Sequence, residues 1–290
     1  MKVHTAQEME AADRAERWRT LALSMPAVLL VTIILLIPVG WLFWLSFTGP
    51  NGLTAVNYIR LYENPAYLSI FQTTFVLSLI VTVVAAALGY PLAYLLSQLP
   101  RTMAILGLLV VLLPFWTSTL VRTYSWLVLL QRRGLINTML VNLGLTGEPL
   151  SLVYNSAGVV IGMVHIMLPF MVLPLYAAMK SVDPMLVRAA VSLGATRRHA
   201  FFTVFAPLTI PGLVAGSLLV FIYCLGFYIT PQILGGGRVN LVSMKILENA
   251  TVYSDWGAAS ALGVVLLVVT LLIFKAIQKI LPVERLMRRA

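Results

Sequence analysis

The sequence places few side chains capable of acid–base chemistry within its long apolar stretches. Arg122 is the one formal charge well inside such a stretch, and His165 is the one imidazole. Ionisable groups are costly in apolar surroundings and are therefore suspects for a pathway, a gate or a proton relay. A relay would need acidic partners in neighbouring stretches, and these contain no Asp or Glu. The sequence favours a hydrogen-bonded packing role for His165, and it leaves Arg122 between a gate and an interfacial position beside Tyr124 and Trp126.

Motifs for catalysis and nucleotide binding are absent from the chain. The sequence contains no Ser-His-Asp set, no H-E-x-x-H pair and no phosphate-binding G-x-x-x-x-G-K-[ST] motif. Its single cysteine, Cys224, excludes an intrachain disulfide framework and a cysteine metal cluster. We interpret the glycine run at 235–237 as a flexible turn. We therefore expect no enzyme, no metal site and no ATP hydrolysis by this chain alone.

The composition is that of a membrane protein. Of 290 residues, 60% are hydrophobic and 10% are charged, whereas soluble domains have about 45–50% apolar and about 25% charged residues. The net charge of +10 is clustered between apolar stretches. This pattern follows from the excess of Lys and Arg in cytoplasmic loops and does not indicate a nucleic-acid-binding face.

Six stretches approach or exceed the roughly 20 apolar residues that a membrane-spanning helix needs. They are 21–47, 70–96, 103–130, 156–179, 207–229 and 257–281. The first is too long for the core of a cleaved signal peptide, so residues 1–20 are expected to remain as a cytoplasmic arm. Because most basic residues fall in alternate loops, both termini and the basic tail at 282–290 are expected in the cytoplasm. The prediction is an all-α bundle at 21–281 with about six spans.

The longest connection on the expected cytoplasmic side is the loop at 180–206. Asp183 is placed to cap a short helix that starts at Pro184, and Gly194 is placed to end it in the left-handed conformation. The helix would present an apolar face with small residues at its centre. That face consists of Leu186, Ala189, Ala190 and Leu193. It could dock into a groove on another protein or lie against lipid headgroups. A second short helix, capped by Thr196, is expected to end before Pro207.

The run from Arg188 to Ala195, followed by Pro207, resembles the cytoplasmic EAA loop of ABC importer permeases. The family pattern is Glu-Ala-Ala-x-x-x-Gly followed by an apolar residue, x and Leu-Pro. The chain matches it at Ala189, Ala190, Gly194 and Pro207, and departs from it with Arg188 for Glu and Ala206 for Leu. The resemblance implies that this loop is a coupling helix moved by an ATP-binding subunit.

Further stretches resemble the spermidine/putrescine-type permease family. These are Leu-Pro-Phe-Trp at 113–116, Leu-Val-Arg-Thr-Tyr-Ser-Trp at 120–126, Gly-Leu-Ile-Asn at 134–137, Leu-Pro-Phe at 168–170 and Thr-Pro-Gln-Ile-Leu-Gly-Gly-Gly at 230–237. The resemblance implies a type I importer permease in the bacterial inner membrane. It also implies two copies of an ATPase with ATP and magnesium, a second homologous permease and a periplasmic solute-binding protein. The alternatives are an importer of another small organic solute and a secondary transporter driven by an ion gradient.

A solute path would have to be lined largely by aromatic and polar side chains. The candidates for the path or its gate are Trp116, Arg122, Tyr124, Trp126, Tyr223, Tyr228 and Asp255. Aromatic faces suit the ammonium groups of a polyamine. Arg122 and the arginines at 132 and 133 would repel a cation, so either a partner permease supplies the acids or the solute is neutral or anionic.

Overall fold

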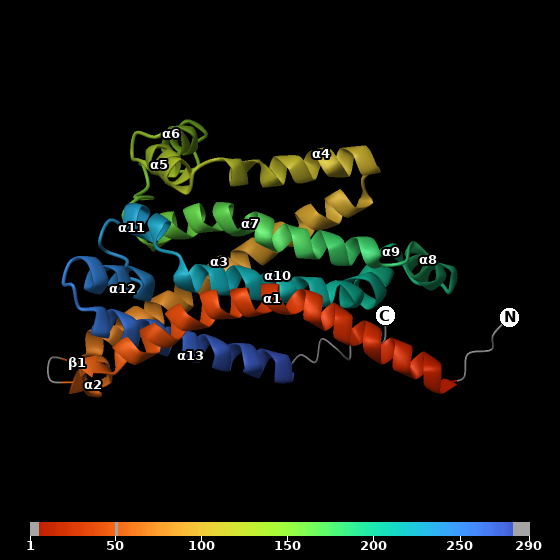
Figure 1. The fold of residues 1–290 in the computed structure, drawn as a ribbon. Coiled ribbons are helices and arrows are strands. Elements are labelled where there is room, and N and C mark those ends of the chain that lie inside the picture. Colours follow the sequence, from red (N-terminus) through yellow and green to blue (C-terminus); the bar gives the residue numbers. More distant parts are fainter. Residues whose placement is uncertain (1–5, 50–51, 281–290) are drawn as a thin grey trace.

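The computed structural model describes residues 6–49 and 52–280, and nearly all of its regular structure is helical (Figure 1). The long helices are α1 (Ala6–Ser46), α3 (Pro65–Gln98), α7 (Ser156–Ser181), α10 (Ala206–Gly226) and α13 (Trp256–Ile280). The shorter helices are α2 (Val56–Glu63), α4 (Arg101–Leu112), α5 (Thr119–Leu130), α6 (Leu135–Asn142), α8 (Pro184–Ser192), α9 (Arg197–Ala200), α11 (Ile229–Gly235) and α12 (Val242–Thr251). A small ribbon, β1 (Thr48–Gly49) with β2 (Gly52–Leu53), follows α1.

Five helical segments are long and apolar enough to cross a membrane. They are Trp18–Ser46, Pro65–Gln98, Ser156–Ser181, Arg197–Gly226 and Trp256–Ala276. A sixth crossing is possible if the bent pair Arg101–Trp116 and Thr119–Asn142 counts as one span. The predicted all-α membrane bundle is therefore confirmed. The tail at 282–290 and the first five residues of the arm at 1–20 lie outside the described residues.

The stretch at 103–130, predicted as one span, is instead broken into two helices that meet at 98°. α4 continues into one 3-10 turn, η1 (Leu113–Trp116), and the backbone is then extended at Thr117 and Ser118 before α5 begins. Pro114 lies in this turn, and proline supplies no backbone N–H to an α-helix. Arg122, on α5, therefore lies beyond the break.

The core of the bundle is made by α3, α7 and α10. α7 lies between the other two and is the most buried of the candidate spans. Small residues allow the close approach: a Cβ at Gly212 of α10 would lie 2.9 Å from the carbonyl oxygen of Pro174 on α7. Met171, wholly buried on α7, fills the space beside Gly216. This packing resembles the small-residue interfaces by which helices associate in lipid.

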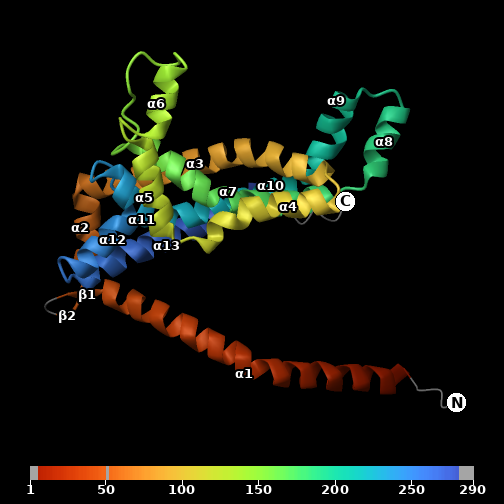
Figure 2. The same cartoon turned by 90° about the horizontal axis from the view of Figure 1, so that it is seen from above.

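α1 stands apart from this core. It contacts α13 near its C-terminal end and diverges from the rest of the molecule towards its N-terminus (Figure 2). The most apolar window of its spanning segment, Trp18–Ser46, is 0% buried in the chain.

The second short helix of the 180–206 loop does not end before Pro207, which corrects the sequence prediction. α9 passes through one wide π-helical turn, η2 (Phe201–Phe205), directly into α10. The N–H of Ala206 bonds to the carbonyl of Phe201, five residues back. A widened turn accommodates Pro207, whose ring would collide with the carbonyl of residue 203 in a regular α-helix. α9, η2 and α10 therefore form one continuous helical segment, and α8 is joined to it by a short turn.

Apart from α4, which runs alongside the bundle, the short elements gather at its two ends (Figure 2). One end carries β1, α2, α5, α6, α11 and α12, and the other carries the α8–α9 hairpin (Figure 2). The N-terminal end of α1 and the C-terminal end of α13 point towards the hairpin end (Figure 1).

Candidate functional site

The α8–α9 hairpin is built by local rules that its sequence satisfies. Asp183 caps α8: its Oδ1 accepts a hydrogen bond of 2.8 Å from the Met185 N–H. Pro184 occupies the first turn, where no N–H is needed. Gly194 has φ of +95° and ends the helix. The Ala195 N–H then donates a hydrogen bond of 3.1 Å to the Ala190 carbonyl. The predicted caps of this helix are thus present.

The outward face of α8 is apolar and uncovered by the chain. Leu193 is 90% exposed and Leu186 is 47% exposed. Ala189 lies exposed between them, and Ala190 is half-buried beside it. Val187, on the opposite side of the helix, packs against the core cluster. An exposed apolar face of this kind has the character of a protein-contact surface.

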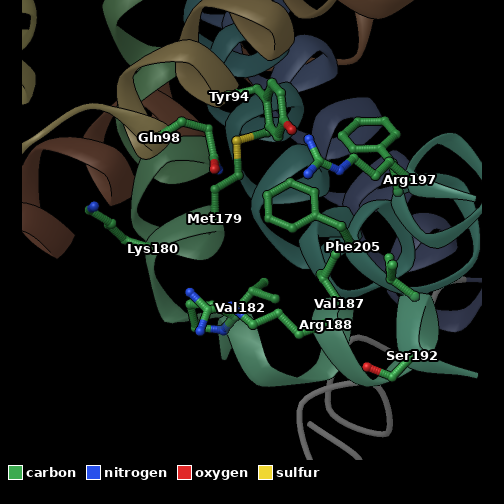
Figure 3. Close-up of a pocket in the computed structure, with 13 residues that line it drawn as sticks. Tyr94, Gln98, Met179, Lys180, Val182, Val187, Arg188, Ser192, Arg197 and Phe205 are labelled. Atoms are coloured by element: carbon green, nitrogen blue, oxygen red, sulfur yellow. The ribbon is translucent and has the colours of Figure 1, made fainter.

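Behind α8 lies a pocket of about 770 Å³ (Figure 3). It is enclosed by the ends of α3 and α7 on one side and by α8, α9 and η2 on the other. Its basic residues are Lys180, Arg188 and Arg197, and no lining residue is acidic. Arg188 therefore belongs to the pocket side of α8, away from the outward face.

The hairpin is fixed to the core through α3. The Lys180 Nζ donates a hydrogen bond of 3.0 Å to the Ser97 carbonyl, which joins the end of α7 to the end of α3. The ring of Tyr94 lies 5.1 Å from that of Phe201 and 5.3 Å from that of Phe205, edge to face in both pairs. These bracing residues were missed from the sequence, although the aromatic residues in the last part of the 180–206 loop were a visible signal. The hairpin is therefore connected to all three core helices.

The predicted gate residues on α5 lie at the opposite end. An Arg122 terminal nitrogen donates to the Thr119 Oγ1 at 3.2 Å, while its Nε is buried without a partner among the described residues. The Trp126 Nε1 donates to the His165 Nδ1 at 3.1 Å, so this ring nitrogen carries no proton. The bond joins α5 to α7 and fits the packing role favoured for His165. Tyr124 is 55% exposed on the same helix.

The aromatic candidates for a path do not form one cluster. Tyr223 of α10 stacks on Phe170 of α7 with ring centroids 4.5 Å apart, and Phe170 meets Phe115 of η1 at 5.1 Å. Trp116 is 76% exposed at the helix break, and Tyr228 is 40% exposed between α10 and α11. The structure therefore brings Tyr223 together with two rings that sequence reasoning did not select.

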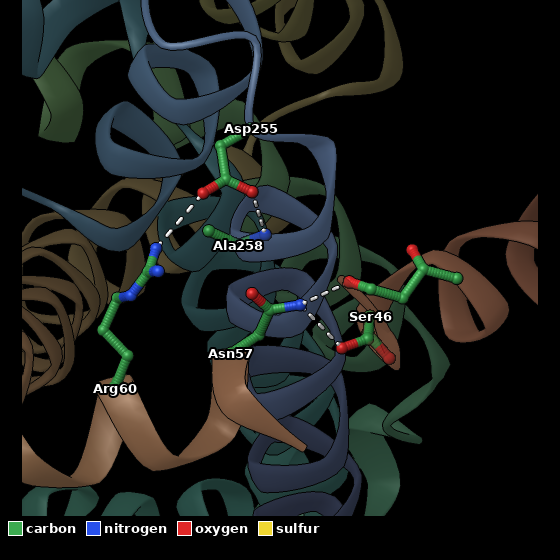
Figure 4. Close-up of polar contacts among 6 residues, drawn as sticks. Ser46, Asn57, Arg60, Asp255 and Ala258 are labelled. Carbon is green, nitrogen blue, oxygen red and sulfur yellow. Dashed lines mark hydrogen bonds and ion pairs between the residues drawn. The ribbon is translucent and has the colours of Figure 1, made fainter. Parts of the chain in front are cut away.

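Asp255 already has partners on both carboxylate oxygens (Figure 4). Its Oδ1 accepts from the Ala258 N–H at 2.9 Å at the start of α13, and its Oδ2 pairs with Arg60 of α2 at 3.2 Å. These contacts account for the side chain as a helix cap and a link between α2 and α13. Among the described residues, no group of His, Cys, Asp and Glu could hold a metal ion.

No family model matches the chain, but curated relatives do. The spermidine/putrescine transport system permease protein PotB of Haemophilus influenzae is 38% identical over 224 residues, 77% of this chain and 78% of the relative. The chain belongs to this permease family. PotB of Escherichia coli is 35% identical over 216 residues, 74% of this permease and 78% of that relative. The Escherichia coli inner membrane ABC transporter permease protein YdcU is 34% identical over 220 residues, covering 71% and 67% of the two chains.

Solved structures show the same fold in other ABC importers. One is a bacterial alginate ABC transporter in complex with a periplasmic protein that holds an alginate pentasaccharide. It matches with a TM-score of 0.71 at 18% identity over 93% of the permease and 97% of that chain. A second structure of an alginate importer has a TM-score of 0.67 at 20% identity, covering 97% and 99% of the two chains. The permease thus has the type I-like fold that its EAA-like loop implied, and it is a multi-pass membrane protein.

Proposed function

We propose that this permease imports a polyamine such as spermidine or putrescine, and that ATP hydrolysis on separate subunits drives the transport. The observation that carries the coupling is the uncovered apolar face of α8 on a hairpin fixed to α3, α7 and α10. A partner protein bound to this face can move the core helices as rigid bodies. Such a movement would open the path alternately to the two sides of the membrane.

The coupling roles follow from the hairpin geometry. Leu186, Ala189, Ala190 and Leu193 form the contact surface, with small residues where the partner approaches most closely. Asp183 and Gly194 fix the two ends of α8, and Pro207 lies in the first turn of α10, where the helix from the hairpin continues into the bundle. Arg188 lies where the family pattern has Glu, but on the pocket side, so docking depends on shape more than on that charge.

The proposed assembly contains two ATPase copies, which carry ATP and magnesium, a second homologous permease and a periplasmic solute-binding protein. A neighbour of the same fold is in complex with a periplasmic protein, which supports the last of these. The permease would lie in the inner membrane with both termini and the α8–α9 hairpin in the cytoplasm. The excess of basic residues at that end supports this orientation.

The solute class rests on the relatives and on aromatic chemistry. The PotB relatives are named for spermidine and putrescine transport. Trp116, Tyr223 and Tyr228 offer ring faces for ammonium groups, while Arg122, Tyr124 and Trp126 would act at an outer gate. Another small organic solute is the second candidate, because Arg122 bears a positive charge and the candidate spans contain no acid. A role for Asp255 in the path stays a prediction.

The test measures uptake of labelled spermidine in proteoliposomes that hold the permease pair, the ATPase and the binding protein. We expect uptake that needs ATP inside, that stops with a hydrolysis-deficient ATPase and that persists when an ionophore collapses the ion gradients. Uptake that continues without the ATPase but stops with the ionophore would contradict the ABC importer. Uptake of a neutral solute in preference to spermidine would contradict only the polyamine assignment.

A further inference from the structure

The pocket behind α8 takes no part in the proposed docking, and its walls are of two kinds. Apolar side chains form much of its lining: Met179, Val182, Val187, Val191, Phe201 and Phe205. Lys180, Arg188 and Arg197 line it as well and are exposed, with Arg188 and Arg197 entering from α8 and α9 on different sides (Figure 3). The pocket is therefore amphipathic, with buried apolar residues such as Met179 and Phe205 and a cationic rim formed by Lys180, Arg188 and Arg197.

Among the described residues, the cationic rim has no acidic residue in the pocket lining. In the same part of the chain, no ion pair joins Arg188 or Arg197. Lys180 gives one hydrogen bond to the Ser97 carbonyl, which leaves two of its three N–H donors for another acceptor. The rim can therefore accept an anion with several acceptor oxygens.

The pocket lies at the depth where the spanning helices end. Gln98 is the last residue of α3 and Lys180 is next to the last residue of α7, and both line the pocket. A phospholipid at this depth offers a phosphate to the rim and an acyl chain to the apolar wall. Basic pockets between spanning helices at the cytoplasmic side hold anionic lipid headgroups in this way.

We propose that this pocket binds an anionic phospholipid, with Arg188 and Arg197 as the charge partners of its headgroup phosphate. A headgroup held by both arginines would join α8 to α9 and stiffen the hairpin against the core. The proposal rests on the proposed function only for the placement of the hairpin at the cytoplasmic leaflet. It gives Arg188 a charge partner that does not depend on the ATPase.

The experiment measures lipid retention by the whole purified complex. The complex is washed in phosphatidylcholine nanodiscs that contain a small share of phosphatidylglycerol, and retained lipid is counted by mass spectrometry. The variant carries Arg188→Gln and Arg197→Gln. The matched control is Arg198→Gln, because Arg198 is exposed on α9 but does not line the pocket. A charge-conserving pair, Arg188→Lys with Arg197→Lys, tests whether the effect is one of charge.

We expect the double Gln variant to retain phosphatidylglycerol more weakly by about fivefold for each arginine lost. The control and the Lys pair should keep most of the lipid. In limited proteolysis of the same complex, phosphatidylglycerol should protect the hairpin from the protease, and inorganic phosphate should not. Equal retention by all variants would overturn the proposal, and so would protection by phosphate alone. Retention that appears only when the ATPase is left out would assign the pocket to an acidic segment of that partner. No solute is needed, so failure of transport leaves this result readable.

Discussion

At the scale of single residues, the amide of Asn57 fixes the C-terminal end of α1. Its Nδ2 donates to the carbonyl oxygens of Ser46 and Thr48, both at 3.1 Å (Figure 4), and the residue is 5% exposed. Gly257 makes room for it, because a Cβ there would lie 2.8 Å from the Asn57 amide nitrogen. One side chain thus joins three helices.

Replacing this amide should destabilise the permease. Asn57→Leu keeps the volume but leaves two carbonyl oxygens without their donor, at a cost of about 1–3 kcal/mol for a buried unsatisfied group. We expect the melting temperature of the purified complex to fall by a few degrees. Asn142→Leu is the matched control, because Asn142 is exposed at the end of α6. Equal melting temperatures for the two variants would show that the amide contributes nothing.

A second residue-scale prediction concerns pH. A hydrogen bond from the Lys245 Nζ, 3.0 Å long, lowers the pKa of Glu248 below its ordinary value, while partial burial acts in the opposite direction. A carboxyl group with a lowered folded-state pKa stabilises the fold above its unfolded pKa, and this contribution is lost as the pH falls through the folded pKa.

Glu248→Gln should therefore lower the melting temperature slightly near pH 7, and the difference from wild type should shrink as the pH falls below about 4. Differential scanning fluorimetry across this range measures both. Glu63→Gln, at the exposed end of α2, serves as the control for loss of a surface carboxylate. A constant difference at every pH would mean that the charge of Glu248 is irrelevant.

At the scale of elements, α8 could be read from the sequence because its boundaries depend on local rules. Asp183, Pro184 and Gly194 act within their own turns, so residue type alone predicts them. The break after Trp116 and the π-turn before Ala206 could not be placed in the same way, although prolines stand beside both. A proline indicates that a regular α-helix is disturbed, but it does not indicate whether a bend, a wide turn or a kink results.

The same distinction between local and long-range rules applies to the candidate site. Residues of the outward face share one helix, so their spacing predicted them. The pocket combines α3, α7 and η2 with α8, and its members, such as Tyr94 and Phe201, are far apart in sequence. Nothing local distinguishes Arg188 as a pocket residue, because its direction depends on which side of α8 faces the core.

The prediction for this element concerns steric fit. Ala189→Trp places a bulky ring at the centre of the outward face, where it should keep the ATPase from docking without disturbing the folded permease. We expect spermidine uptake to fall at least about tenfold, as a loss of about 1.4 kcal/mol in docking would give, while the amount of permease in the membrane is unchanged. Ala189→Ser, which keeps a small side chain, should transport normally. Full uptake by the Trp variant would exclude α8 as the docking helix.

At the scale of the whole molecule, the two ends of the bundle differ in shape and should face different compartments. The hairpin end carries Leu193 as its most exposed large apolar residue, and the other end carries Tyr62, which is 93% exposed on α2. Cys224, the single cysteine of the sequence, is buried. The unmodified permease should therefore give little background signal in thiol labelling.

With Cys224→Ala as the parent, Tyr62→Cys should react with a membrane-impermeant maleimide in spheroplasts. Leu193→Cys should react only after the membrane is permeabilised, in cells that lack the ATPase. Unchanged wild-type permease, with its thiol buried, should stay unlabelled in both cases. Labelling of the Leu193→Cys variant from outside would reverse the proposed orientation.

The separation of α1 from the core bears on how the permease is made. A ribosome releases the chain from its N-terminus, so α1 enters the lipid before α3, α7 or α10 has been translated. Since α1 contributes nothing to their mutual packing, those three can assemble without waiting for it to settle. α1 can thus anchor the nascent chain in the membrane, and its own contacts with α13 can form last.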